Sequence, residues 1–147
     1  MKKLLTVLLI SGVFISCKKD STTATTPTPN PTAARSFTCT INGAAFTADS
    51  AWYNNFNAGG TNIFAVKGSG ATAQLFEINL TGTTATTYAF PPHAFTYATT
   101  TNYNATAGSL NISTYDATNR KISGSFTGIT AGAFTITNGA FANLPYK

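Results

Sequence analysis

Few side chains in this sequence could carry out nucleophilic, acid–base or metal chemistry. His93 is the only histidine, whereas a hydrolytic triad needs a nucleophile, a base and an orienting acid. Ser69 stands between two glycines, which predicts a turn rather than a nucleophile elbow. Zinc takes three or four nitrogen or sulfur ligands, and His93 with Cys39 cannot supply them. The three acidic residues beyond position 36 are too scattered to predict a glycosidase pair or a calcium site. We therefore expect no enzyme activity, no cofactor and no metal.

Aromatic residues interleaved with asparagine and threonine suggest a different chemistry. One such stretch runs over residues 52–57 and another over residues 88–103. Aromatic rings can stack on sugar rings, and side-chain amides can hydrogen-bond sugar hydroxyls. The alternative is that a β core uses these rings for bulk, while asparagine and threonine keep the surface soluble. Both interpretations remain open, and the candidate ligand-binding residues are Trp52, Tyr53, Tyr97 and Tyr103.

The elements that must position these residues are β-strands. From Ser36 onward, apolar residues recur at every second position, as at Phe76, Ile78 and Leu80; this is the period of a half-buried strand. Asn42-Gly43 is the strongest short hairpin signal. The repeated strand and turn signals predict an antiparallel β-sandwich or barrel-like sheet of about eight to ten short strands.

Two strands can be assigned an inner face. In the predicted strand over residues 120–129, Phe126 and Gly128 share the inner face and Thr127 points outward. In the first strand, Cys39 alternates with apolar neighbours, so we expect this thiol to behave as a small buried hydrophobe. The part of the chain from position 36 carries four basic and three acidic residues. Because this balance leaves no basic patch, we expect no nucleic-acid partner.

The first residues have the layout of a secretory signal peptide. Two lysines precede an uncharged apolar run over residues 4–15, and the small Ser16 stands directly before Cys17. The apolar run is 12 residues long, whereas a helix that crosses a membrane needs about 20. We therefore expect a cleaved signal peptide over residues 1–16 rather than a permanent membrane span.

Phe14-Ile15-Ser16-Cys17 resembles a bacterial lipobox, and Lys18-Lys19-Asp20 resembles the start of mature lipoproteins of the Bacteroidota. The resemblance implies that Cys17 receives a diacylglyceryl thioether and becomes the first mature residue. It also implies sorting to the outer membrane, because lysine rather than aspartate follows the cysteine. A thiol suits the reaction because its thiolate is a strong nucleophile. Two or three acyl chains anchor a protein stably. The expected partner is thus the membrane, with the chain facing the cell surface or the periplasm.

Residues 17–35 form the predicted tether. Threonine, alanine and proline dominate residues 20–34, and such a segment buries too little apolar surface to offset the entropy lost on ordering. We therefore expect it to be disordered. Asp20-Ser21-Thr22 resembles the short O-glycosylation motif of the Bacteroidota, which implies Ser21 as a candidate acceptor. Asp49-Ser50-Ala51 resembles the same motif.

Three further motifs resemble a domain family of unknown function in Bacteroidota lipoproteins. They are INGxxFxA at Ile41–Ala48, KISGSF at Lys121–Phe126 and ITNGAF at Ile136–Phe141. The resemblance spans residues 36–146. It implies an all-β fold and a location in the cell envelope, and it implies no activity.

Two functions follow as expectations. The first is an outer-membrane-anchored lipoprotein whose domain over residues 36–147 is a non-catalytic module in a structural, adhesive or accessory role. Its partner would be an envelope protein or a polysaccharide. The second is a glycan-binding module of an envelope polysaccharide uptake system. An exposed Trp52 beside an exposed tyrosine would favour glycan binding, and a buried Trp52 would favour the first function.

Overall fold

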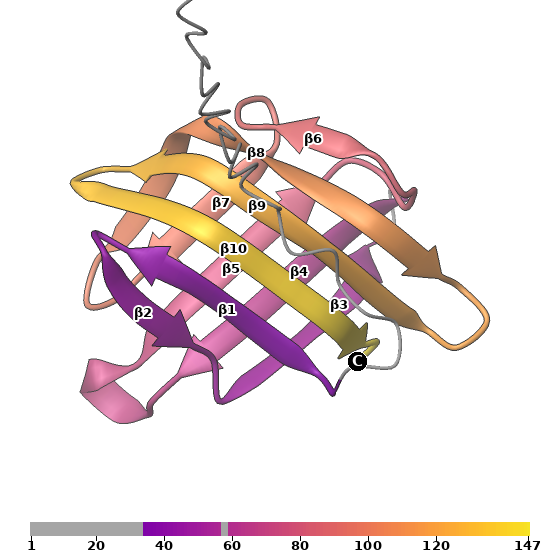
Figure 1. Ribbon diagram of the computed structural model, residues 1–147, viewed down its shortest axis with the longest axis horizontal. Coiled ribbons are helices and arrows are strands. Elements are labelled where there is room, and N and C mark those ends of the chain that lie inside the picture. The colour runs from indigo at the N-terminus through magenta and orange to yellow at the C-terminus, as the bar shows by residue number, and fades with distance from the viewer. Residues whose placement is uncertain (1–33, 57–58) are drawn as a thin grey trace, which may run out of the picture.

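The computed structural model describes residues 34–56 and 59–147, so the predictions for the signal peptide, for Cys17, for Ser21 and for most of the tether lie outside the described residues. Ten β-strands make up most of this part of the chain (Figure 1). They are β1 (Ser36–Ile41), β2 (Ala44–Thr47), β3 (Ser50–Phe56), β4 (Gly60–Lys67), β5 (Gln74–Leu80), β6 (Thr87–Ala89), β7 (Ala94–Ala98), β8 (Asn102–Asp116), β9 (Lys121–Ala131) and β10 (Phe134–Pro145). A short 3₁₀ turn, η1 (Gly70–Thr72), lies between β4 and β5.

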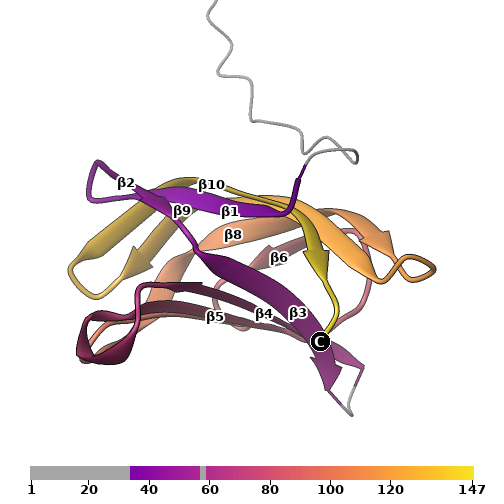
Figure 2. The same cartoon turned by 90° about the horizontal axis from the view of Figure 1, so that it is seen from below.

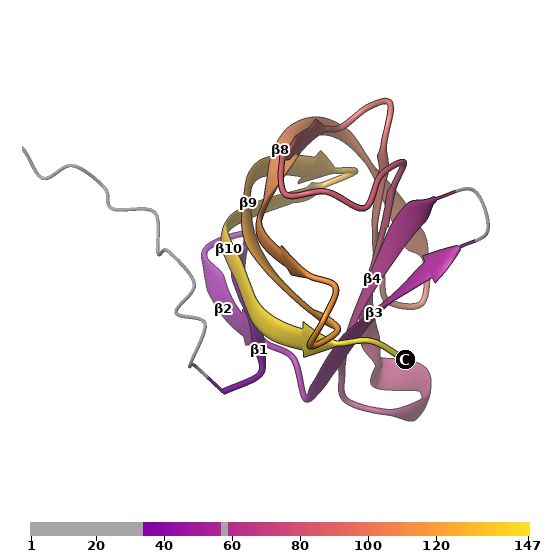
Figure 3. The same cartoon turned by 90° about the vertical axis from the view of Figure 1, so that its right-hand side faces the viewer.

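The ten strands form a single sheet whose neighbouring strands are antiparallel. Their order is β2-β1-β10-β9-β8-β7-β5-β4-β3, and β6 lies off this path, paired with β8. The sheet curls so that β1, β8, β9 and β10 face β3, β4 and β5 across the interior (Figures 2 and 3). The predicted all-β, barrel-like architecture is therefore confirmed.

The curl brings the edge strand β3 against the end of β10. Tyr53 forms a parallel bridge with Tyr146, and the backbone N–H of Lys147 donates to the Tyr53 carbonyl oxygen at 2.9 Å. The Tyr53 ring lies 5.4 Å from the Tyr146 ring and 5.9 Å from the Tyr115 ring, between centroids. The Arg120 guanidinium carbon lies 3.8 Å from the centroid of the Tyr146 ring. An aromatic cluster with two backbone contacts thus joins these strands, in place of a full hydrogen-bond ladder.

The hairpin predicted at Asn42-Gly43 joins β1 to β2. Both turn residues have positive φ, +47° and +84°, as a two-residue type I′ turn requires. The turn is also tied to β10: Asn42 N–H donates to the Thr135 carbonyl at 2.9 Å, and Thr135 N–H donates to Asn42 Oδ1 at 2.7 Å. The same asparagine therefore supplies the turn conformation and holds the turn in place.

Strand alternation is confirmed in β5 and corrected in β9. Phe76, Ile78 and Leu80 are fully buried, and Phe126 is 2% exposed. The prediction for Gly128 is wrong, because this residue is exposed and Ile129 is buried instead. Gly128 has a φ of +66°, and two β9 residues stand there against one β8 residue. Such a bulge shifts the alternation by one residue.

Strands β8 and β10 are longer than the sequence pattern predicts. Alternation indicates strands only over residues 109–115 and 133–137, whereas β8 spans 15 residues and β10 spans 12. The cause is local backbone geometry. In β8 the register shifts around Gly108, which has a φ of +123°. In β10, Asn138 and Asn143 have φ near +50°, a region that asparagine tolerates better than most residues. Because each irregularity interrupts the period of two, the pattern stops before the strand does.

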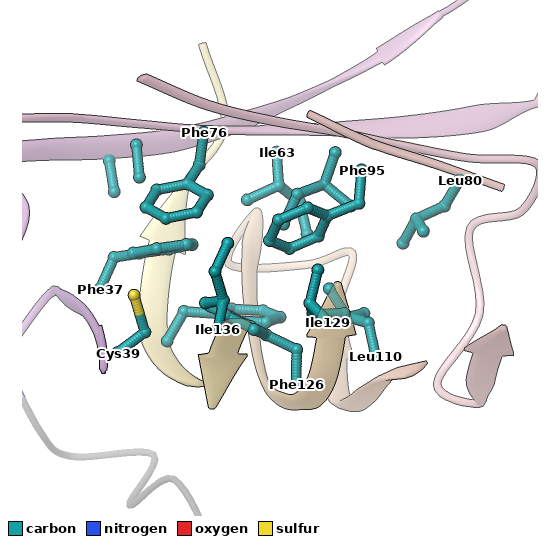
Figure 4. Close-up of a cluster of buried hydrophobic side chains, with 14 of the residues drawn as sticks. Phe37, Cys39, Ile63, Phe76, Leu80, Phe95, Leu110, Phe126, Ile129 and Ile136 are labelled. Carbon is teal, nitrogen blue, oxygen red and sulfur yellow. The ribbon is translucent and has the colours of Figure 1, made fainter. Parts of the chain in front are cut away.

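Aromatic side chains fill the interior between the two halves of the sheet (Figure 4). Phe37 lies 5.4 Å from both Phe76 and Phe126, between ring centroids. Phe95 lies 5.6 Å from Phe76 and 5.5 Å from Phe126. Such pairs contribute about 0.5–1.5 kcal/mol each beyond the area they bury. These four rings join strands that come from both halves of the sheet.

Two G-x-F sequences meet in the pairing of β9 with β10. Gly139 lies opposite Phe126, and Gly124 lies opposite Phe141. A methyl group on Gly139 would collide with the Phe126 ring, and one on Gly124 would collide with the Phe141 ring and the Asn111 carbonyl oxygen. Each glycine therefore leaves the space that the phenylalanine of the other strand occupies, as when an aromatic ring covers a strand glycine.

Candidate functional site

The four predicted ligand-binding aromatics do not form one patch. Tyr53 and Tyr97 are 2% and 3% exposed, and the Tyr97 ring lies 5.0 Å from Phe76 and 5.0 Å from Phe134. Both tyrosines belong to the core. Tyr53 therefore offers no exposed ring face for stacking on a sugar, whereas Tyr97 also lines a surface hollow between β1–β2 and β4–β5. Tyr103 is paired with Tyr97 and packs 4.8 Å from Phe134, so its ring also serves the core.

Trp52 alone of the four points away from the interior. It is half-buried, and its ring stacks on Phe64 at 5.5 Å with an interplanar angle of 20°. The Lys147 ammonium lies 4.6 Å from the Trp52 ring centroid. In sheet order, β7, β5 and β4 separate Trp52 in β3 from Tyr103 in β8. The indole therefore has intramolecular partners and no exposed tyrosine among its cross-strand neighbours.

The outer side of β3, β4 and β5 carries aromatic and amide groups in adjacent rows. Trp52 is paired with Phe64, and Asn54 is paired with Asn62, which is paired with Asn79. All five side chains are half-buried, and we call them the aromatic–asparagine face. Sequence reasoning missed the β4 and β5 members, although the buried Ile63 and Ala65 imply by alternation that their neighbours point outward.

Cys39 is a free, buried thiol, as predicted. Burial raises its pKa from 9.0 to about 12, and the nearby positive charge of Lys67 offsets this only in part. Burial likewise raises the pKa of Tyr53 from 10.0 to about 12. Neither group is therefore set up as a nucleophile at neutral pH.

We expect the domain to lose stability as the pH rises from 9 to 12. The folded protein holds the protons of Cys39 and Tyr53 more tightly than the unfolded chain does, because both pKa values rise on folding. The stability they contribute is complete below the unfolded pKa values and is lost as the pH rises through the folded ones. Urea unfolding midpoints across this range measure the loss, and Cys39→Ala should show a smaller one. A midpoint that stays constant would contradict the prediction.

The remaining candidates for chemistry serve the fold. His93 Nδ1 accepts a hydrogen bond from the Thr81 N–H at 3.2 Å, and its ring lies 5.0 Å from the Tyr88 ring. Ser69 is the exposed residue that precedes η1. Within residues 34–56 and 59–147, no group of three or more histidine, cysteine or acidic side chains could hold a metal ion. In the same part of the chain, no helix has the length and apolarity to span a membrane.

At least two hollows open on the surface of the described residues. One, of about 190 Å³, lies between β1–β2 and β4–β5; there the Lys67 ammonium stands 5.3 Å from the Phe46 ring centroid. The other, of about 240 Å³, lies where the β8–β9 hairpin meets the end of β10, and we call it the hairpin hollow. It is lined by Thr114, Asp116, Asn119, Lys121, Ser123 and Asn143.

Asp116 is held at the rim of the hairpin hollow by its own turn. Its Oδ1 accepts from the Asn119 N–H, and its Oδ2 accepts from the Asn119 side-chain amide, both at 2.8 Å. These bonds lower the pKa of Asp116, and the charge of Lys121 lowers it further by a smaller amount. The carboxylate is therefore ionised at neutral pH.

Comparisons with protein-family models, with curated proteins and with solved structures give no significant match for this chain. The resemblance to Bacteroidota lipoproteins therefore stays a prediction from the sequence motifs.

Proposed function

We propose that this chain is an outer-membrane-anchored lipoprotein of the cell envelope. In this proposal, lipid on Cys17 holds the chain at the membrane and residues 17–35 act as a tether. The β domain from Ser36 onward is a non-catalytic module in a structural, adhesive or accessory role. The charged start, the apolar run and the small residue before Cys17 support export and anchoring.

The filled interior of the domain is the observation that carries the proposed role. Phe37, Phe76, Phe95 and Phe126 are each 2% exposed or less, and their rings contact one another across the space between the two halves of the sheet. A barrel-like sheet can hold a ligand inside only where side chains leave room. A partner of this domain would therefore meet its outer surface, which is the kind of contact a structural or adhesive module uses.

A glycan-binding role is the second candidate, and the aromatic–asparagine face favours it. Phe64 and Trp52 supply rings, and Asn54, Asn62 and Asn79 supply amides on neighbouring strands about 4.8 Å apart. Amides both donate to and accept from hydroxyls. The Trp52 ring, however, already contacts Phe64 and the Lys147 ammonium. A sugar that stacks on the indole would have to compete with these contacts, and for this reason the role without a glycan stands first.

Trp52→Ala separates the two roles. We expect this variant of the full chain to stay folded and to lose about 1 kcal/mol of unfolding free energy. The deleted ring packs on the outside of the sheet, where its removal costs one stacking contact with Phe64. Affinity electrophoresis of the full chain in detergent, through gels containing dextran, xylan or laminarin, measures glycan binding. The leading proposal predicts that Trp52→Ala and the unaltered chain have the same mobility in every gel, because no sugar contacts the indole.

The matched control is Thr127→Ala, which alters an exposed side chain on β9. Retardation that Trp52→Ala abolishes and Thr127→Ala preserves would overturn the leading role in favour of glycan binding. If Trp52→Ala instead unfolds the domain, the indole belongs to the folding core and the glycan role loses its main residue.

A further inference from the structure

The base of the hairpin hollow is polar, and the strands around it pair irregularly. Ser123 is 3% exposed and lies between Ile122 and Gly124, which are also buried. Because successive strand residues point to opposite faces, Ser123 points away from the core and is covered by neighbouring chain instead. Its Oγ accepts a hydrogen bond from the Asn143 N–H at 2.9 Å. A buried hydroxyl thus lies at the base of this surface hollow.

Both strands beside Ser123 lose their regular register at this level. In β8 the pairing with β9 shifts between Ile112 and Thr114. In β10 it shifts between Phe141 and Leu144, where Asn143 has a φ of +50°. Bulges of this kind re-aim side chains and are over-represented at sheet edges, at barrel rims and beside active sites. Here they bring Thr114 and Asn143 to the wall of the hollow.

The rim offers acceptors and donors of both charge signs. The Asp116 carboxylate has about four lone-pair positions, so the two bonds from Asn119 and the one from the Thr118 backbone leave about one position for a ligand. Lys121 is the cross-strand neighbour of Asp116, and its ammonium carries three donors. The formal charges of the Asp116 carboxylate and the Lys121 ammonium, the two charged groups that line the hollow, cancel. A cation would face Lys121 and an anion would face Asp116, so this balance favours a ligand without net charge.

The volume of the hollow and its hydrogen-bonding groups further restrict the class of ligand that fits. The hollow of about 240 Å³ is smaller than sites for drug-sized molecules, which begin near 300 Å³. Its hydroxyls and amides can each donate and accept, and its charged groups do one or the other. A small polyhydroxyl ring matches this mixture, because every hydroxyl on it can donate to one group and accept from another.

We infer that the hairpin hollow binds one ring of a neutral sugar. Hydroxyl groups of the sugar donate to the Asp116 carboxylate and accept from the Lys121 ammonium and the Thr114 hydroxyl. This site goes beyond the accessory role proposed above and is separate from the aromatic–asparagine face, so it can succeed or fail independently of either.

Two-dimensional amide NMR of the full chain in detergent micelles tests the inference. The probes are glucose, galactose and N-acetylglucosamine, with glycine as a zwitterion and sodium acetate as an anion. We expect the sugars to shift the amide signals of Lys121, Ser123 and Asn143, with a dissociation constant that is roughly millimolar. Lys121→Met and Thr114→Val should each weaken binding by about fivefold, because each removes one hydrogen-bonding group.

The variants alter exposed side chains, and the signals of the buried Ile122 and Gly124 report whether the fold is intact. Thr127→Val, also exposed on β9, should leave sugar binding unchanged. Three results would overturn the inference: no sugar-dependent shift, shifts with glycine or acetate but not with sugars, or unchanged affinity in both folded variants. Sugar-dependent shifts confined to the aromatic–asparagine face would overturn it as well, and would point to the glycan role discussed above.

Discussion

Replacing Phe126 with alanine is expected to lower the free energy of unfolding by about 3–5 kcal/mol, the usual cost of deleting a buried phenylalanine side chain. The residue is 2% exposed, and its ring contacts Phe37 and Phe95 and occupies the space that Gly139 leaves. Because domains are stable by only about 5–15 kcal/mol, this is a large share of the total. Urea unfolding followed by circular dichroism measures the loss.

Thr127→Ala is the matched control for Phe126→Ala. Thr127 is the next residue of β9 and is exposed, so we expect its truncation to change the unfolding free energy by less than about 0.5 kcal/mol. If the two variants lost equal stability, the register of β9 described above would be wrong by one residue, since a one-residue slip exchanges the two faces of a strand.

The second large effect is expected for Cys17→Ser. Under the proposed function, Cys17 is the residue that takes the thioether, and serine lacks the thiol that this reaction needs. We expect the variant to remain an uncleaved precursor without diacylglyceryl lipid, whereas the unaltered chain begins at a lipid-modified Cys17. Mass spectrometry of the N-terminal peptide distinguishes the two forms.

Cys39→Ser provides the control, because Cys39 is the only other cysteine. This variant should keep the lipid, although the buried position makes it less stable. An unmodified Cys17 in the unaltered protein, or a mature chain that starts at another residue, would refute the anchoring proposal. The same spectra show whether Ser21 carries a glycan.

Trp52 and Tyr53, two of the candidate ligand-binding residues, show what strand alternation can predict and what it cannot. Trp52 and Tyr53 are adjacent in β3, so their side chains must point to opposite faces, and both could not contact one ligand. The alternation alone leaves open which of them faces the core. Packing decides this: Tyr53 fits against Tyr115 and Tyr146, where β3 meets β10, and Trp52 is left outside with Phe64.

The hairpin hollow was beyond prediction for a related reason. Its lining residues come from β8, β9, β10 and the turn between β8 and β9, and they meet only because both strands beside Ser123 shift register. Asp116 and Asn119 have the spacing of a polar turn, and the sequence indicates no more than that. No spacing of residues in the sequence predicts that Ser123 contacts the Asn143 backbone.

What the sequence determined by itself is local: the strand period, the Asn42-Gly43 turn, and the fact that Phe76 and Phe126 face inward. These features depend on alternation and on backbone preference within a few residues. The tertiary structure alone decided the order of the strands and which β9 residues beyond Gly128 face the core. It also decided the pairing of the two G-x-F sequences, in which each ring fills the space beside the glycine of the other strand. Such matches join residues distant in sequence, and only the shared space of the folded interior selects them.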